Sequence, residues 1–362
     1  MDKKPAIFMV STPLHLYNAL AIALQHREDW QSHLWFIDQK DWLNPYFQVL
    51  KGWKDQPFAG IDYFVTNLPG NAARIKARKE AFDKIDGLVA DIRPRELLVG
   101  NDRRIEFVYA INHACRRSGL PVRGSLIDDG VYSYIDQRSK WFQDTGPERW
   151  MKKLVYGSWY ERTPSIGGSP FIDRAFVAFP EFVNSYLRRL KVEGIDLELY
   201  RSPEIRTYSE MLLESGNIDR QELPGYDLVL TLPHESLFNR FPNFQKSMRI
   251  LVDSVRNGGK RVGIKYHPRQ KEDDPLQLVS GDDQLIPRTV AFEILLPLLG
   301  KPLILGDVST VLLTARWLRP DLPVVALQNE RDPRQRKMAR ILTHLGVKVT
   351  RDLDEILSFL PA

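Results

Sequence analysis

Short apolar runs alternate with longer amphipathic stretches along the first half of the chain. The run at 6–10 is followed by Ser11-Thr12-Pro13 and then by apolar residues at helical spacing to about residue 25. This order predicts a strand, a capped helix start and a helix. The same alternation predicts further strands at 33–38, 61–66, 96–99, 122–127 and 175–179, and helices at 43–50, 72–92 and about 104–118. Strands that alternate with helices are typical of a parallel, doubly wound sheet.

The alternation restarts after a less regular, aromatic-rich section at 131–225. That section forms either an acceptor-binding region or loops and helices packed on the first sheet. We therefore expect an α/β protein with a Rossmann-like domain at 1–180, a linker at 181–224 and a second Rossmann-like domain at 225–362. Two facing Rossmann-like domains occur in GT-B type glycosyltransferases, but also in periplasmic-type binding proteins and some synthetases, so the fold alone does not choose a function. The second domain is predicted from strands at 227–232, 261–266, 302–305, 323–327 and 347–350, and helices at 241–256, 291–299, 308–317, 334–345 and 352–359.

Composition narrows the class of partner. The chain has 362 residues, is 43% hydrophobic and 27% charged, and carries a formal net charge of +5. This mild basic surplus suits an anionic ligand or membrane surface, but no basic run interleaved with aromatics indicates a nucleic-acid module. The one cysteine, Cys115, cannot form an internal disulfide, and no Cys/His spacing indicates a structural metal site.

The pattern also bears on location. No apolar run reaches the roughly 18 residues that a membrane-spanning helix needs, and the first residues resemble the start of a strand more than a signal peptide. We expect a cytoplasmic protein, either without membrane contact or peripheral on the cytoplasmic face of an anionic inner membrane. The basic segment 331–340 is read either as a solvated helix face or as a patch for lipid headgroups.

Polar residues follow several predicted strands of the first domain. Ser11 and Thr12, Asn101 to Arg103, and Asp128-Asp129-Gly130 each come directly after an apolar run. In open α/β sheets, ligands bind outside the carboxyl ends of the strands, so these residues should converge on one edge. Taken alone, the Asp-Asp-Gly stretch is also compatible with an ordinary turn.

The second domain has three candidate groups of its own. Lys265 and His267-Pro268 end an apolar strand, and an imidazole there can hydrogen-bond a phosphate or protonate a leaving group. Ser309-Thr310 opens a helix, where backbone N–H groups and hydroxyls suit a single phosphate, although Ser309 also reads as an N-cap. Glu293 falls early in an apolar helix, and either a ribose or the helix dipole accounts for it.

In this order, the motifs resemble those of bacterial sialyltransferases. The shared features are Asp-Asp-Gly at 128–130, His-Pro at 267–268, Ile-Pro to Phe-Glu at 286–293 and Ser-Thr at 309–310. The stretch Ser-Thr-Pro-Leu-His-Leu at 11–16 is similar to the Thr-Pro-Leu-Gln opening of the bacterial lipooligosaccharide and capsule sialyltransferases. The third motif is Ser-Thr where the family also has Ser-Ser, and the 131–225 region matches weakly.

The resemblance implies a mechanism and a set of roles. The donor would be a CMP-linked sugar acid and the acceptor a bacterial surface glycan, lipopolysaccharide or capsule, with inversion in a single displacement. One aspartate would act as general base, Asp128 being favoured over Asp129. CMP carries one phosphate, so no metal or other cofactor is expected. In the same resemblance, His267 with Pro268 would contact the phosphate, and Ser309 and Thr310 would hold it. Glu293 would bind the ribose, and Ile286 and Pro287 would face the cytosine. Anionic groups of the substrates would lie near Thr12, Arg103, Lys265 or Arg269.

Two other functions stay open at this point. The first is transfer of Kdo, because transferases of that sugar use comparable motifs and the same type of CMP donor. The second is a non-catalytic two-domain protein, or an enzyme that uses UDP-sugars in the manner of an epimerase. UDP would call for a second phosphate contact at a helix start, and Gly258-Gly259 falls at a predicted helix end instead.

Overall fold

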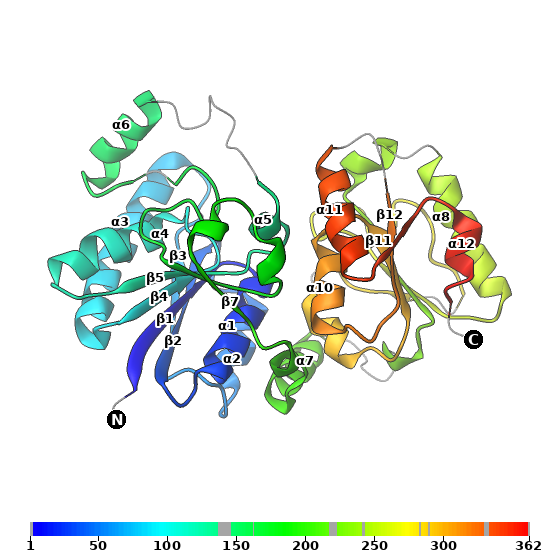
Figure 1. Ribbon diagram of the computed structural model, residues 1–362, viewed down its shortest axis with the longest axis horizontal. Coiled ribbons are helices and arrows are strands. Elements are labelled where there is room, and N and C mark those ends of the chain that lie inside the picture. Colours follow the sequence, from blue (N-terminus) through cyan, green and yellow to red (C-terminus); the bar gives the residue numbers. More distant parts are fainter. Residues whose placement is uncertain are drawn as a thin grey trace. The chain divides into compact units, whose positions relative to one another are not determined.

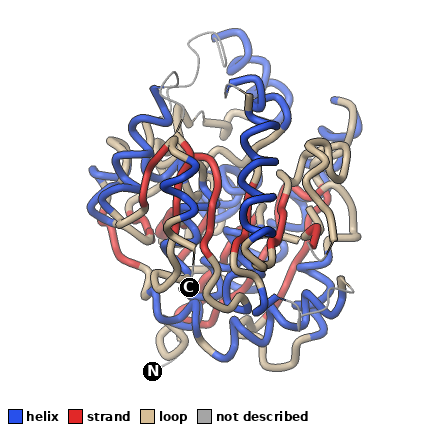
Figure 2. The backbone as a smooth tube through the Cα atoms, turned by 90° about the vertical axis from the view of Figure 1, so that its right-hand side faces the viewer, coloured by secondary structure: helices blue, strands red, loops and turns tan. Residues whose placement is uncertain are grey.

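The computed structural model divides the chain into two compact units, Met1–Tyr200 and Arg201–Ala362, each built on its own parallel sheet. In both units the helices flank the strands (Figures 1 and 2). No helix among the described residues is both long enough and apolar enough to cross a bilayer. The structure describes residues 3–136, 146–161, 163–216, 223–240, 243–281, 284–288, 290–328 and 333–360.

The first sheet has seven strands in the order β3-β2-β1-β4-β5-β6-β7, and the described pairs are parallel. Its first five strands follow the 3-2-1-4-5 order of Rossmann-type folds. The elements of this unit are β1 (Lys4–Val10), α1 (Pro13–Gln25), β2 (Trp30–Gln39), α2 (Pro45–Gly52), β3 (Gly60–Val65), α3 (Asn71–Ile92), β4 (Glu96–Val99), α4 (Ile105–Tyr109), a π-helical turn (Ala110–Cys115), β5 (Arg123–Ile127), α5 (Val131–Tyr134), α6 (Gly146–Tyr156), β6 (Arg174–Val177) and β7 (Lys191–Gly194).

The second sheet repeats this topology in the order β10-β9-β8-β11-β12-β13. Figure 1 shows its strands between α10 and α11 on one side and α8 and α12 on the other. Its elements are α7 (Pro203–Ser215), β8 (Leu228–Thr231), α8 (Phe244–Asn257), β9 (Val262–Lys265), β10 (Gln284–Leu285), α9 (Phe292–Leu295), β11 (Leu303–Asp307), α10 (Thr310–Leu318), β12 (Val324–Leu327), α11 (Pro333–His344), β13 (Lys348–Thr350) and α12 (Leu353–Leu357).

Local chemistry explains where several helices begin. Thr12 precedes Pro13, and its side chain accepts a hydrogen bond from the backbone N–H of His15 at 3.3 Å. Asn44 before Pro45 and Ser202 before Pro203 repeat the pattern at α2 and α7. A capping oxygen satisfies an N–H that the first turn leaves unpaired, and proline fits there because it has no N–H to satisfy. The helix start predicted at Ser11-Thr12-Pro13 is confirmed.

The structure differs from the prediction between the two domains. Residues 181–224, expected as a linker, include β7, which pairs in parallel with β6 and extends the first sheet. The same stretch includes α7, and the division between the units falls after Tyr200. The sequence of β7, Lys-Val-Glu-Gly, has one apolar residue, as an edge strand with an exposed face allows, and this polarity hid the strand.

Candidate active site

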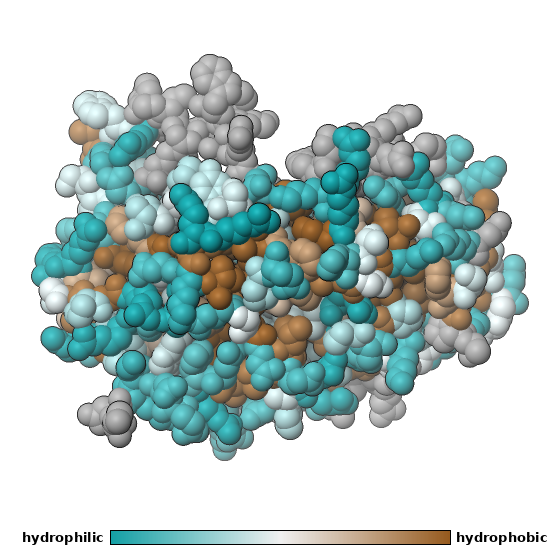
Figure 3. Space-filling model, viewed as in Figure 1, coloured by the Kyte–Doolittle hydropathy of each residue, from teal (hydrophilic) through white to brown (hydrophobic). Residues whose placement is uncertain are grey.

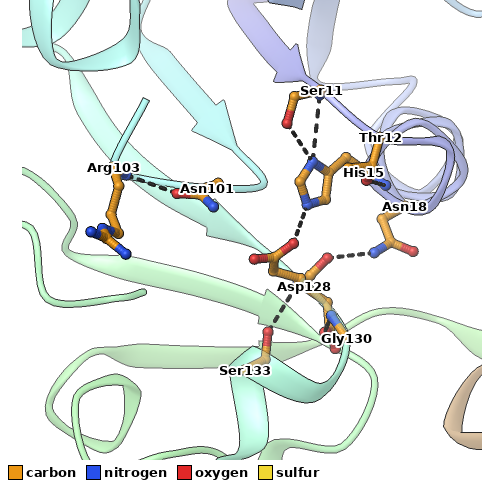
Figure 4. Close-up of polar contacts among 10 residues, drawn as sticks. Ser11, Thr12, His15, Asn18, Asn101, Arg103, Asp128, Gly130 and Ser133 are labelled. Carbon is orange, nitrogen blue, oxygen red and sulfur yellow. Dashed lines mark hydrogen bonds and ion pairs between the residues drawn. The ribbon is translucent and has the colours of Figure 1, made fainter. Parts of the chain in front are cut away.

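The first candidate site lies at the carboxyl ends of neighbouring strands in the first unit. β1 and β4 are adjacent, although they are not consecutive in the chain, and this is the switch point where open α/β sheets bind ligands. Ser11 follows β1, Asn101 follows β4, and Asp129 follows β5. Figure 4 shows Ser11, Asn101 and Asp128 at this edge. The predicted convergence of these strand ends is therefore confirmed.

A buried histidine joins two of the strand ends. His15, on the first turn of α1, is 1% exposed, and its Nε2 lies 2.6 Å from Oδ1 of Asp129. Its Nδ1 faces the backbone N–H of Ser11 at 3.5 Å and the Ser11 hydroxyl at 3.3 Å. Figure 4 shows the ring of His15 beside Ser11. Because Nδ1 accepts from Ser11, the ring proton belongs on Nε2, which then donates to Asp129.

The paired carboxylate keeps one oxygen available. The side chain of Asp129 is 12% exposed, and Oδ1 alone has a hydrogen-bond partner among the residues that the structure describes. The backbone N–H of Asp129 donates to the hydroxyl of Ser133 at 2.8 Å. This second hydrogen bond fixes the main chain of Asp129. A carboxylate fixed through one oxygen, with the other directed elsewhere, has the arrangement of a general base.

Gly100 makes this histidine position sterically available. A Cβ built at residue 100, directly after β4, would lie 2.2 Å from the imidazole of His15. Such a contact is far inside van der Waals range, so only a glycine allows the ring to lie flat against the strand end. The strand end and the first turn of α1 are therefore matched in shape.

Asp128 has a different environment from its neighbour. Its side chain is completely buried, and its carboxylate accepts hydrogen bonds from Gly130 N–H at 2.8 Å, from Ala178 N–H at 3.0 Å and from the Tyr134 hydroxyl. Its backbone carbonyl accepts from the side-chain amide of Asn18. Burial raises the pKa of Asp128 to about 6, although the hydrogen bonds to its carboxylate act to lower the pKa. Asp128 thus ties β5, α5 and the end of β6 together.

Basic side chains line a cavity beside this edge. The cavity, of about 460 Å³, is bounded by α3, the start of α4 and α6, and its neighbour of about 280 Å³ shares Arg103, Arg104 and Lys152. Arg103 is exposed and lines both cavities, whereas Thr12 lines a small cavity of about 60 Å³ with Ser11. The larger cavity is lined by Asn71, Arg74, Ile75, Arg78, Arg103, Arg104, Ile105, Met151, Lys152, Val155, Tyr156 and Tyr160. Five cations and two tyrosines suit an anionic ligand with an extended polar surface.

In the second unit, two residues of the predicted set, Lys265 and Pro287, are joined by a hydrogen bond. A third, Glu293, is close enough to affect the pKa of Lys265. Lys265 at the end of β9 is 5% exposed, and its ammonium donates to the carbonyl of Pro287 at 3.2 Å. Burial lowers the pKa of Lys265 to about 8, and the charge of nearby Glu293 opposes that shift. Ile286 is buried and its backbone N–H donates to the carbonyl of Ile264, whereas Pro287 is exposed.

His267 is oriented by its own loop. Its Nδ1 accepts the backbone N–H of Arg269 at 3.1 Å, which places the ring proton on Nε2. Burial lowers the pKa of His267, and the nearby charges of His234, Arg269 and Lys265 lower it further. The ring of His234 stands edge-on to that of His267, with 5.5 Å between centroids. Pro268 is exposed and follows the strand end as expected.

The hydroxyl pair lies at the switch point of the second sheet. β11 and β8 are adjacent, and Ser309-Thr310 opens α10 directly after β11. Ser309 is the N-cap residue, and its hydroxyl hydrogen-bonds Asp307, whose pKa burial raises to about 6 despite that bond. Both hydroxyl residues are half-buried. Helix-start N–H groups beside two hydroxyls can hold one phosphate.

The described residues contain no group of three His, Cys, Asp or Glu side chains placed to hold a metal ion. Sequence reasoning missed His15, Gly100, Tyr134 and His234 as parts of these sites. The signal for His15 was its spacing, four residues after Ser11 on the first helical turn. For His234 it was Leu-Pro-His after β8, a strand end followed by a ring nitrogen, as at His267.

Two parallel sheets of this order, each with polar groups at its switch point, are the architecture of the GT-B fold. Solved structures similar to the chain include the alpha/beta-galactoside alpha-2,3-sialyltransferase of the luminous marine bacterium Photobacterium phosphoreum (TM-score 0.58, 10% identity, covering 98% of this chain and 100% of that one). A sialyltransferase from Photobacterium damsela (0.53, 11%, 97% and 82%) and the UDP-GlcNAc 2-epimerase of Methanocaldococcus jannaschii (0.53, 14%, 98% and 91%) share the fold.

The family follows from the sequence. The model of the alpha-2,8-polysialyltransferase (POLYST) family matches residues 6–328, nearly the whole chain, and the chain belongs to this family. It is therefore a glycosyltransferase of the sialyltransferase family, and the predicted resemblance is confirmed. A search of curated proteins finds no matching sequence.

Proposed function

We propose that the chain transfers a sialic acid, or a related nonulosonate, from a CMP-sugar to a bacterial surface glycan by a single inverting displacement. The observation that carries the proposal is the His15–Asp129 pair, with its 2.6 Å hydrogen bond, at the switch point of the first sheet. Membership of the polysialyltransferase family supports the choice of sugar. The pair supplies what the acceptor hydroxyl needs, which is a base held in one orientation.

Asp129, not Asp128, is the base in this proposal. Asp128 is buried, and both of its oxygens already accept hydrogen bonds from protein groups. Asp129 can take the acceptor proton on Oδ2 while His15 continues to donate to Oδ1. The hydrogen bond from His15 fixes the rotamer of Asp129, and Asp128 shapes the loop that carries it.

The second unit holds CMP in this proposal. The hydroxyls of Ser309 and Thr310 and the N–H groups that open α10 receive the phosphate, with Nε2–H of His267 as a further donor. The lowered pKa of His267 favours the neutral ring, so it acts as a hydrogen-bond donor to the departing phosphate. Glu293 accepts from the ribose, and the backbone at Ile286-Pro287 faces the cytosine. Lys265 donates a hydrogen bond to the Pro287 carbonyl and so fixes the backbone at this position.

The acceptor is proposed to bind in the basic cavity of the first unit. Arg103 follows β4, whose neighbour β5 ends at Ile127, two residues before Asp129. Arg103 and Arg74 give the cavity wall a positive charge, whereas the charge of Arg104 is paired with Asp38. Tyr156 and Tyr160 add aromatic surface against which a sugar ring can lie. Such a lining favours an acidic glycan over a neutral one.

The donor assignment is tested with a panel of CMP- and UDP-sugars, with nucleotide release as the readout. We expect release of CMP from CMP-sialic acid, accelerated by an acidic glycan acceptor. Turnover of CMP-Kdo alone would transfer the proposal to that sugar acid. Binding of UDP without affinity for CMP would overturn the CMP donor altogether and favour an epimerase-like protein.

Transfer is also expected to need no metal ion. A monophosphate leaving group carries less charge than a diphosphate, and donors from a helix start, His267 and two hydroxyls can balance it. Addition of EDTA to the same assay should leave the rate within about twofold of the untreated rate. A rate that collapses with EDTA and returns with Mg²⁺ would contradict this part of the proposal.

A further inference from the structure

The outer face of helix α6 carries apolar side chains that the fold does not cover. Trp150, Met151 and Leu154 are 67%, 57% and 65% exposed. At 3.6 residues per turn they lie within about 100° of one another and form a single stripe. Figure 1 shows α6 at the upper edge of the first unit, and Figure 3 shows hydrophobic atoms at the same place among hydrophilic ones.

Cations border this stripe on both sides. By helical position, Arg149 and Lys153 fall on one side of Trp150 and Lys152 falls beyond Met151. Arg149 and Lys153 share one carboxylate, Glu161, at 2.8 and 3.0 Å, so this pair of cations is only half compensated. Lys152 stands over the ring of Tyr160. The border of the stripe is therefore net positive.

The helix is firmly attached at its carboxyl end. The hydroxyl of Tyr156 accepts a hydrogen bond from Arg78 of α3 at 3.0 Å. Trp159, just beyond the helix, packs edge-on against Phe82 and Tyr109, with centroids 5.3 and 5.0 Å away. The side toward the rest of the unit, with Met151, Lys152, Val155 and Tyr156, lines the basic cavity, so Met151 lies between the cavity and the outer stripe. The exposed stripe is thus the outer surface of an ordered element.

We propose that the outer face of α6 docks onto an anionic lipid bilayer, with Trp150 and Leu154 entering the headgroup region. An apolar stripe flanked by lysine and arginine is the pattern of helices that lie in a membrane interface, where tryptophan is also enriched. A helix of this length is about 16 Å long, so its stripe offers roughly 160 Å², far below the approximately 800 Å² per partner of a stable protein interface. A bilayer, in contrast, needs no matching surface.

The segment 331–340, considered above for the same role, differs from α6 in what it exposes. The described side chains Arg336, Lys337 and Arg340 are exposed, but Met338 and Ala339 are buried in their own unit. Residues 331–332 lie outside the described part of the chain. The described portion of α11 therefore offers charge without an apolar stripe, which fits a solvated helix face better than an inserted one.

Vesicle flotation of the full chain tests the proposal. We expect binding to phosphatidylcholine vesicles that contain phosphatidylglycerol, weaker binding at high salt, and little binding to phosphatidylcholine alone. The double variant Trp150→Ser/Leu154→Ser should lose about tenfold or more in partition coefficient, because two interfacial apolar groups are removed. The matched control Leu43→Ser/Ile250→Ser removes two other exposed apolar side chains and should float like the wild type.

A second readout reports insertion itself. Brominated lipids should quench part of the tryptophan fluorescence, and Trp150→Phe should lose that quenched component. The proposal is overturned if the wild type does not float at low salt, or if the double variant floats like the wild type. A wild-type dimer that dissociates in the double variant without vesicle binding would assign the stripe to a second copy instead. None of these readouts depends on transfer, so donor turnover and membrane docking are tested separately.

Discussion

Asp129→Asn should abolish transfer while leaving the fold intact. An amide in place of the carboxylate cannot take the acceptor proton, and general-base catalysis is worth about 10²–10⁴ in rate. The loss should therefore appear in kcat. The KM for the CMP-sugar should be nearly unchanged, because the donor contacts proposed above all belong to the second unit. Steady-state kinetics with varied donor and acceptor would measure both constants.

Two matched variants separate catalysis from structure. His15→Gln keeps an N–H donor for Asp129 and should retain much more activity than Asp129→Asn. Asp128→Asn replaces a carboxylate oxygen that accepts hydrogen bonds from buried donors with an amide NH₂ group, which cannot accept them. The free energy of unfolding should therefore fall by about 1–3 kcal/mol. If Asp128→Asn kept its stability and lost transfer, while Asp129→Asn remained active, the two assignments would have to be exchanged.

His267→Ala should lower kcat by about 10²–10³, the usual loss when one preorganised donor to a developing charge is removed. Its Nδ1 is occupied by the N–H of Arg269, which leaves Nε2–H as the ring donor for the proposed contact with the phosphate. The loss should be smallest for a donor whose leaving group needs least stabilisation. Donor sugars that carry nucleotide leaving groups of graded acidity, assayed with the wild type and with His267→Ala, measure this dependence.

His234→Ala serves as the control for that experiment. Its ring contacts His267 edge-on, and its removal changes the surroundings of the ring without removing the donor. We expect a loss of less than about tenfold. Equal losses in the two variants, independent of the leaving group, would indicate that His267 supports the loop and does not contact the phosphate.

Much of the fold could be predicted because parallel strands that are buried on both faces are apolar throughout. β4 lies at 96–99 as predicted, and the residues of β1 from Ala6 to Val10 are fully buried. The elements that escaped prediction are short or polar. β7 has one apolar side chain, and β10 consists of two residues, so neither leaves a periodic pattern.

Only those features of the candidate site that depend on neighbouring residues in the sequence could be predicted. Strand alternation puts Asp128 and Asp129 on opposite faces, but it does not say which face is covered. That depends on Tyr134 and on Ala178, fifty residues further along the chain. The hydrogen bond between His15 and Asp129 spans 114 positions and depends on the order of strands in the sheet, which periodicity does not encode.

The close fit between Gly100 and His15 makes the two positions interdependent in evolution. A side chain can be gained at residue 100 only if residue 15 first becomes smaller, and that change would break the contact with Asp129. An imidazole at residue 15 in turn requires a glycine at the end of the neighbouring strand. In relatives of this chain, the residue at position 100 should therefore report whether the carboxylate corresponding to Asp129 is held by a ring or by a smaller side chain.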